Sequence, residues 1–299
     1  MATLVRRTGE ILQQALKPST QRAYQRAWDR FHAFASSLQP PRSSLPALPS
    51  TIALFITSLV DADETLAAAS IVSTISAISY RHKLLEYDPT SHFLVRKLLH
   101  SVSAARPAGD TRLPLTIVML QQLIGVTSAL PSPYEATLAA AMFATMYAAL
   151  LRVGEVTQSP HNINFSNITL ANNQLSITFV SYKHHNGRPV TLTFAASHNA
   201  NICPVRLLTK YIMLRGESPG PLFAWIDGRA IAQSWFRRTL QTAVGLTQGQ
   251  TQNITPHSFR IGAATHAAAS GKSVLQIQAM GRWRSNAFLK YIRIPTFNM

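Results

Sequence analysis

The sequence predicts a mainly α-helical protein with two domains, of which the second contains a small antiparallel β-sheet. Apolar residues recur at helical spacing along most of residues 19–104 and again in the C-terminal third. A polar stretch rich in Pro and Gly, ARPAGDTRL at 105–113, separates two regions that are each long enough to bury a core. Two alternating runs, 173–180 and 189–194, flank the turn signal Asn186-Gly187 and predict a β-hairpin.

These boundaries divide the chain into an all-helical domain at 1–104, a linker at 105–113 and a mostly helical domain with the sheet at 114–299. In the first domain, a loose arm ends at Pro18, and Ser19 or Thr20 is expected to cap a helix that runs to about residue 37. Further helices are expected at about 50–60, 64–85 and 90–104.

The first long helix is predicted to have one apolar face and one basic face. Its aromatic residues recur at helical spacing and are expected in the core: Tyr24, Trp28, Phe31 and Phe34. A basic stripe follows the spacing i, i+4, i+8: Arg22, Arg26 and Arg30. The stripe is either a solvated face or a contact for the backbone of a nucleic acid.

The second domain is expected to begin with helices at about 116–129 and 134–151, the latter buried. Arg152 follows that buried helix directly, and Glu155 lies one turn further on. The predicted hairpin then carries Lys183 near its tip, and helices resume near 204–216 and 231–245.

Residues 255–293, TPHSFRIGAATHAAASGKSVLQIQAMGRWRSNAFLKYIR, contain many cations and no Asp or Glu. We expect a helix capped by Thr255 and ending at Gly271, with His257 and Arg260 on one face of its first turn. A second helix is expected from about Ser273 to Gly281 and a third over 284–292. Trp283 and Tyr291 are about two helical turns apart, so they can share a face.

The charge of the chain points to an anionic partner. There are 28 Lys and Arg against 12 Asp and Glu, a net charge of +16, and from Gly228 onward there is no carboxylate side chain. This asymmetry favours nucleic acid over a membrane surface, because no strongly basic amphipathic helix stands out. The apolar run 136–151 is short for a membrane span.

Cysteine and histidine usage limits the other classes. Cys203 is the only cysteine, so no intramolecular disulfide can form and a reducing compartment is expected. No Cys/His cluster has zinc spacing, so no metal site is predicted. The N-terminus lacks the apolar core of a signal peptide, so we do not expect secretion.

Taken in order, Arg152, Lys183, His257, Arg260, Trp283 and Tyr291 resemble the catalytic set of the tyrosine recombinases, the phage-integrase family. Glu155 matches the acidic support position of that family, and residues 19–104 look like its helical core-binding domain, a clamp for DNA. The segments HSFRIGAAT and GRWRSNAFLKYIR are most similar to those of recombinases from eukaryotic DIRS-like and Ngaro-like mobile elements. The resemblance implies a helical clamp domain followed by a mostly helical catalytic domain with a small antiparallel sheet.

The resemblance also implies a role for each residue. Tyr291 would attack a DNA phosphate and form a 3′-phosphotyrosine bond, with His257 accepting its proton. Arg152 and Arg260 would offset charge on the phosphorane, and Trp283 would donate its indole N–H to the phosphate. Lys183 would protonate the leaving 5′-oxygen, although Arg188 and His184 share its loop. No metal, nucleotide or other cofactor is implied, because the covalent bond retains the energy of the phosphodiester.

The expected partners are double-stranded DNA, at terminal repeats or recombination sites, and further copies of the chain in a tetramer on paired DNA sites. No membrane partner is expected, and the location would be the nucleus in a eukaryote or otherwise the cytoplasm. Eight residues follow Tyr291, whereas many members of the family have a longer tail that docks into a neighbouring subunit. We therefore expect this docking of the tail between subunits to be shortened, replaced or truncated. Two alternatives are a type IB topoisomerase, which uses similar chemistry but relaxes DNA as a monomer, and a domesticated DNA-binding protein without cleavage. The resemblance of residues 19–104 to a core-binding domain argues against the first, and the presence of all six side chains argues against the second.

Overall fold

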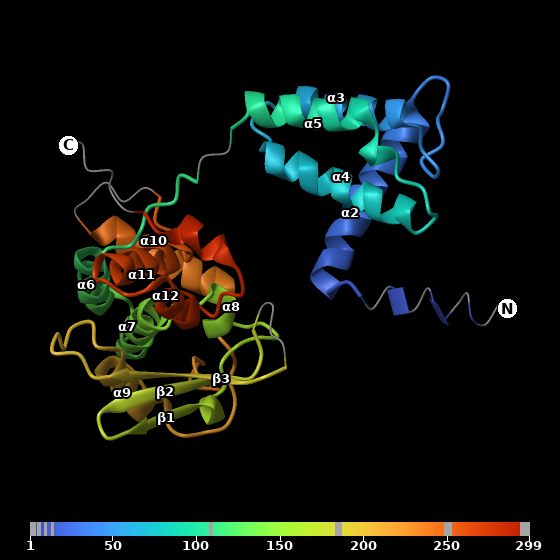
Figure 1. Ribbon diagram of the computed structural model, residues 1–299. Coiled ribbons are helices and arrows are strands. Elements are labelled where there is room, and N and C mark those ends of the chain that lie inside the picture. Colours follow the sequence, from blue (N-terminus) through green and yellow to red (C-terminus); the bar gives the residue numbers. More distant parts are fainter. Residues whose placement is uncertain are drawn as a thin grey trace, which may run out of the picture. The chain divides into compact units, whose positions relative to one another are not determined.

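The computed structural model describes residues 4, 7–8, 11–12, 15–107, 110–182, 187–247 and 253–293, apart from the side chain of Ala287. The chain divides into two compact units, Met1–Asp110 and Thr111–Met299 (Figure 1). Both units are mainly helical, and the second also contains a three-stranded antiparallel sheet, which confirms the predicted fold class. Among the described residues, no helix is long and apolar enough to cross a membrane.

Within residues 15–107, the first unit has four α-helices around one apolar core. These are α2 (Pro18–Ser37), α3 (Pro49–Ala62), α4 (Ala68–Lys83) and α5 (Phe93–Ala105), with the 3₁₀ turn η1 (Pro89–Ser91) before α5. Proline begins both α2 and α3, where its missing N–H has no helical partner to lose. The predicted cap of α2 by Ser19 or Thr20 is therefore wrong, because Lys17 is the N-cap residue.

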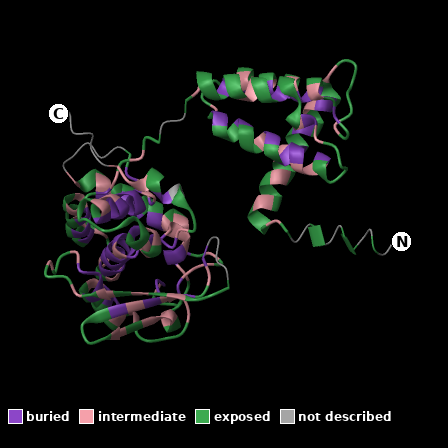
Figure 2. Ribbon diagram, in the orientation of Figure 1, coloured by how far each residue is buried: buried purple, intermediate pink, exposed green. Residues whose placement is uncertain are grey.

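The two faces of α2 differ in burial. Trp28 and Phe31 are buried in the core, whereas Tyr24 and Phe34 are only half-buried. The three arginines of the basic stripe, Arg22, Arg26 and Arg30, are all exposed. The predicted amphipathic helix is therefore present, since α2 carries buried aromatic residues and exposed arginines. Figure 2 shows buried and exposed segments throughout this unit.

The second unit is organised around α7 (Pro133–Ala148), in which residues 137–147 are all buried. This confirms the buried helix expected before Arg152. The other helical segments are α6 (Ile117–Gly125), η2 (Val126–Ala129), α8 (Val153–Val156), η3 (Phe165–Asn167), α9 (Pro204–Arg215), α10 (Gln233–Leu246), α11 (Ser258–Ala269), α12 (Val274–Gly281) and η4 (Asn286–Tyr291). Helices α6, α9 and α11 all contact α7.

The sheet of the second unit consists of β1 (Ile168–Ala171), β2 (Gln174–Phe179) and β3 (Val190–Ala195), hydrogen-bonded in that order. Strands β2 and β3 form the predicted hairpin, and their register pairs Phe179 with Val190. Strand β1 was not predicted from the sequence. It joins β2 through Asn172 and Asn173, which both have positive φ angles that asparagine tolerates well.

Two of the predicted C-terminal helices differ in extent from the structure. Helix α11 begins at Ser258 rather than at the first residue after Thr255, because residues 255–257 form a turn in which the Ser258 N–H donates to the Thr255 carbonyl. The predicted helix over 284–292 is only the 3₁₀ segment η4. Helix α12 agrees with the prediction, and the Ser273 side chain caps it by accepting from the Gln276 N–H at 3.2 Å.

Close packing of α11 gives a test of the fold. A Cβ atom added at Gly262 would lie 1.8 Å from the Leu115 carbonyl oxygen, so Gly262→Ala forces the two backbones apart. We expect it to lower the free energy of unfolding by about 1–3 kcal/mol. Gly245→Ala in α10 is the control, because its Cβ would meet nothing within 4 Å. For that variant, we expect the free energy of unfolding to rise by about 0.4–1 kcal/mol. Equal urea-unfolding midpoints for the two variants would contradict the packing described for α11.

Candidate active site

The C-terminal end of α7 places Arg152. The chain reverses through Leu150, whose φ of 47° is in the left-handed region, and Arg152 then becomes the N-cap of α8. Glu155 fixes Arg152 from within α8: one carboxylate oxygen accepts the Arg152 backbone N–H at 2.8 Å, and the other lies 3.3 Å from its guanidinium. The Arg152 side chain is still 24% exposed, so it can reach a ligand.

Glu155 has a second cationic partner, which the sequence did not indicate. The guanidinium of Arg282, the residue after α12, lies 2.9 Å from a Glu155 carboxylate oxygen. Arg282 also donates to the Ala149 carbonyl at 3.1 Å. Both side chains of this ion pair are buried, and burial lowers the pKa of Arg282 while Glu155 opposes that shift. One buried carboxylate therefore connects α8 to the segment that precedes Trp283.

Arg260 is the largest fully buried side chain of the described residues. Its guanidinium donates to the carbonyls of Leu150 and Gly281, and the ring of Trp283 covers it at 4.6 Å from guanidinium carbon to ring centre. Burial lowers the pKa of Arg260 to about 9, and nearby Arg152 adds to that effect. Arg260 is thus still a cation at neutral pH, and it lies behind Trp283.

Three aromatic rings meet at one wall of the site. The ring centre of Tyr291, in η4, lies 4.8 Å from that of His257 and 5.2 Å from that of Trp283. Thr265 of α11 holds the backbone here, because its hydroxyl donates to the Tyr291 carbonyl at 3.1 Å and accepts the Arg293 N–H at 2.9 Å. Residues 34 positions apart in sequence are therefore neighbours at this wall.

These side chains border a pocket of about 890 Å³. Among the described residues that line it are no Asp or Glu and five arginines: Arg112, Arg152, Arg237, Arg282 and Arg284. The side chain of Arg282 is itself buried, so the guanidiniums that can face a ligand are those of the other four. His257, Trp283 and Tyr291 also line it. A pocket with this lining suits an anion, and a phosphate can accept hydrogen bonds from several guanidiniums at once.

The structure thus brings together four of the six predicted residues, Arg152, His257, Trp283 and Tyr291, at one pocket. Arg260 lies directly behind it and Glu155 is buried beside Arg152. Lys183 lies outside the described residues, as does His184. Arg188, from the same loop, is described and exposed.

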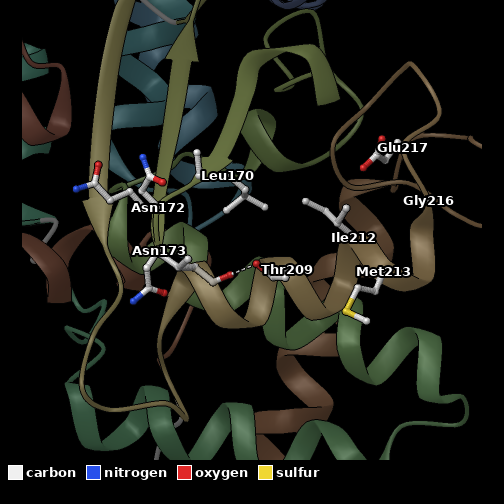
Figure 3. Close-up of a pocket in the computed structure, with 11 residues that line it drawn as sticks. Leu170, Asn172, Asn173, Thr209, Ile212, Met213, Gly216 and Glu217 are labelled. Atoms are coloured by element: carbon white, nitrogen blue, oxygen red, sulfur yellow. Dashed lines mark hydrogen bonds between the residues drawn. The ribbon is translucent and has the colours of Figure 1, made fainter.

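A second pocket, of about 640 Å³, lies between the β1–β2 turn and α9 (Figure 3). Asn172 and Asn173 lie on one side of it, and Ile212 and Met213 on the other. None of the predicted site residues lines it, and Glu217 is its only charged side chain among the described residues. The cationic pocket is therefore the better candidate for chemistry on an anion.

The phage integrase family model matches residues 119–293, which is more than half of the chain and includes all six residues of the predicted set. The chain therefore belongs to the phage integrase family, the tyrosine recombinases. The fold is similar to that of the Tn1549 transposon integrase in complex with circular intermediate DNA, with a TM-score of 0.65 and 12% identity over 99% of this chain and 94% of that one.

Lambda integrase has a similar fold as well. A dimer bound to a COC′ core site gives a TM-score of 0.64 and 18% identity over 100% of this chain and 97% of that one. A lambda integrase tetramer bound to a Holliday junction gives a TM-score of 0.64 and 16% identity over 98% of this chain and 77% of that one. At such low identities the likeness concerns the fold alone. No curated protein sequence matches the chain.

Proposed function

We propose that this chain is a DNA recombinase that cuts and rejoins strands through a covalent bond between Tyr291 and a 3′-phosphate. The observation that carries this proposal is the position of Tyr291 against His257 and Trp283, at a pocket lined by five arginines and by no carboxylate among its described residues. A phenol beside a proton acceptor, in a cationic pocket, has what is needed for attack on a phosphodiester.

In the proposed reaction, the Tyr291 oxygen attacks phosphorus and its proton passes to His257. The bond from phosphorus to the 5′-oxygen breaks, and Lys183 supplies the proton that leaves with the 5′-hydroxyl. A 5′-hydroxyl from another strand then attacks the phosphotyrosine, which reverses the step and restores Tyr291. Because the phosphodiester energy is held in the covalent bond, neither a nucleotide nor a metal ion enters the reaction.

The arginines have different parts in this proposal. Arg152 contacts the non-bridging oxygens directly, since its guanidinium is partly exposed at the pocket. Arg260 compensates charge from behind Trp283, because its terminal nitrogens already donate to two carbonyls. Trp283 donates its indole N–H to the phosphate and covers Arg260.

The proposed substrate is double-stranded DNA at the terminal repeats or recombination sites of a mobile element of the DIRS-like or Ngaro-like kind. We place the helical unit as the clamp around that DNA and propose a tetramer on two paired sites. A net charge of +16 favours separate monomers without DNA, and phosphate neutralisation favours assembly. The similar lambda integrase structure on a Holliday junction is a tetramer, which supports this assembly.

The test of the proposed function uses nicked duplexes, selected from a random pool for binding to the chain. We expect a covalent protein–DNA adduct and, with two duplexes, exchanged strands, both in excess EDTA, because guanidiniums rather than a metal offset the phosphorane charge. Activity that is lost in EDTA and restored by Mg²⁺ would move the chain to another reaction class. Cutting and religation without exchange between duplexes would favour the topoisomerase alternative, and binding without an adduct would favour the non-catalytic one.

We further propose that the basic stripe of α2 contacts the DNA backbone. Arg26→Ala should weaken DNA binding and reduce the slope of log affinity against log salt by about one phosphate contact. Titrations at several salt concentrations measure both quantities. Arg96→Ala, on α5 of the same unit, is the control, because it removes one exposed charge outside the stripe. Equal salt slopes for the two variants would make the stripe a solvated face.

A further inference from the structure

Arg282 has an unusual combination of backbone and environment. Its φ of 54° and ψ of 42° lie in the left-handed region, which a residue with a Cβ atom rarely adopts. Its side chain is 0% exposed, and its guanidinium carbon lies 3.8 Å from the ring centre of Phe179 at the end of β2. A buried cation at a strained position is maintained only where its surroundings hold it strongly.

The contacts of Arg282 connect the elements that form the site. It donates to Ala149 after α7, pairs with Glu155 in α8 and immediately precedes Trp283. Gly281, on its other side, allows the Trp283 ring to fold back, since a Cβ there would lie 1.8 Å from a ring carbon. The backbone conformation of Arg282, the C-cap of α12, therefore determines the direction in which the chain continues to Trp283.

Glu155 divides its acceptor capacity between two arginines. One carboxylate oxygen accepts the Arg152 backbone N–H at 2.8 Å and the Arg282 guanidinium at 2.9 Å. The other is 3.3 Å from the Arg152 guanidinium, which is a long bond. The carboxylate is thus bound tightly by Arg282 and only loosely by the side chain of Arg152.

We propose that Arg282 is a positioning residue that holds Glu155 and thereby leaves the guanidinium of Arg152 available to the DNA phosphate. This inference rests on the proposed function and assigns Arg282 no contact with substrate, because its side chain is buried. Without Arg282, Arg152 is the remaining ion-pair partner of Glu155 among the described residues, and Glu155 turns to pair with it through both oxygens. The donors of Arg152 that face the phosphate are then engaged, and cleavage slows.

The test is a double-mutant cycle of Arg282→Gly and Glu155→Gln, measured as the rate of adduct formation on the selected nicked duplexes at saturating DNA. Glycine keeps the backbone conformation without strain, and glutamine keeps an acceptor for the Arg152 backbone N–H. Arg282→Gly should slow adduct formation about 100-fold. The double variant should form adduct about tenfold faster than Arg282→Gly alone, because no carboxylate is left to pair with Arg152.

Controls separate this effect from lost stability and from failure of the proposed function. Arg229→Ala removes an arginine whose ion pair with Asp227 is exposed, and it should form adduct at the wild-type rate. If Arg282→Gly does not fold, Arg282→Gln, alone and with Glu155→Gln, replaces it in the cycle. A double variant that is as slow as or slower than the single one would make Arg282 merely structural and overturn the inference, as would an unaffected single variant. A wild-type chain without adduct would instead overturn the proposed function, and this inference with it.

Discussion

Tyr291→Phe should abolish the covalent protein–DNA adduct and leave DNA affinity unchanged. The phenyl ring retains the packing against His257 and Trp283, so the wall of the pocket keeps its shape. Only the hydroxyl is lost, and with it the nucleophile. Denaturing gels of chain incubated with nicked duplex measure the adduct, and a filter or gel-shift titration measures the affinity.

Two other tyrosines of the same unit provide the comparison for Tyr291. Tyr182 is buried, and Tyr182→Phe should form adduct normally. Tyr211 is also buried; burial raises the pKa of its hydroxyl, which donates to the Ala224 carbonyl at 3.0 Å and is held away from any ligand. An adduct of normal yield in Tyr291→Phe would require another nucleophile and would refute the assignment.

Arg152→Ala should lower the rate of cleavage by about 10²–10³-fold, because it removes a guanidinium that offsets charge developing on the phosphorane. Arg152 is the partly exposed arginine that Glu155 anchors at the pocket, so its loss affects the transition state more than binding. Single-turnover cleavage at saturating DNA measures this effect separately from affinity.

The matched control for Arg152 is Arg238→Ala. Arg238 is exposed on α10 and is not among the described residues that line the pocket, but its loss changes the net charge of the chain by the same amount. It should weaken DNA binding modestly at most and leave the cleavage rate at saturation unchanged. Equal losses of rate in both variants would mean that overall charge, rather than the position of Arg152, governs the reaction.

Elements that depend on local pattern could be predicted from the sequence. The helical spacing of apolar residues predicted α2, their alternation predicted the β2–β3 hairpin, and the long apolar run predicted the buried α7. These patterns succeed because the period of a helix or strand is expressed within a few consecutive residues. The order of Arg152, His257, Trp283 and Tyr291 also led to the pocket at which the structure places them.

Elements that depend on contacts with distant parts of the chain were harder to predict, because their own residues show little periodicity. Strand β1 is only four residues long, and it acquires its structure by pairing with β2. The residues after Trp283 form a short 3₁₀ segment, since they are held by tertiary contacts such as that of Thr265 with Tyr291. Helical spacing in the sequence could not distinguish this segment from an α-helix.

By itself, the sequence determined the helical class, the cationic character and four of the side chains that meet at the pocket, those of Arg152, His257, Trp283 and Tyr291. Only the tertiary structure decided which cations face a ligand and which are buried. Arg282 contacts Ala149 and Glu155 across 133 and 127 positions of sequence, and Arg260 reaches Leu150 across 110. Burying a guanidinium requires acceptors, and these acceptors are supplied by backbone and a carboxylate far away in the chain. No local pattern around either arginine contains that information.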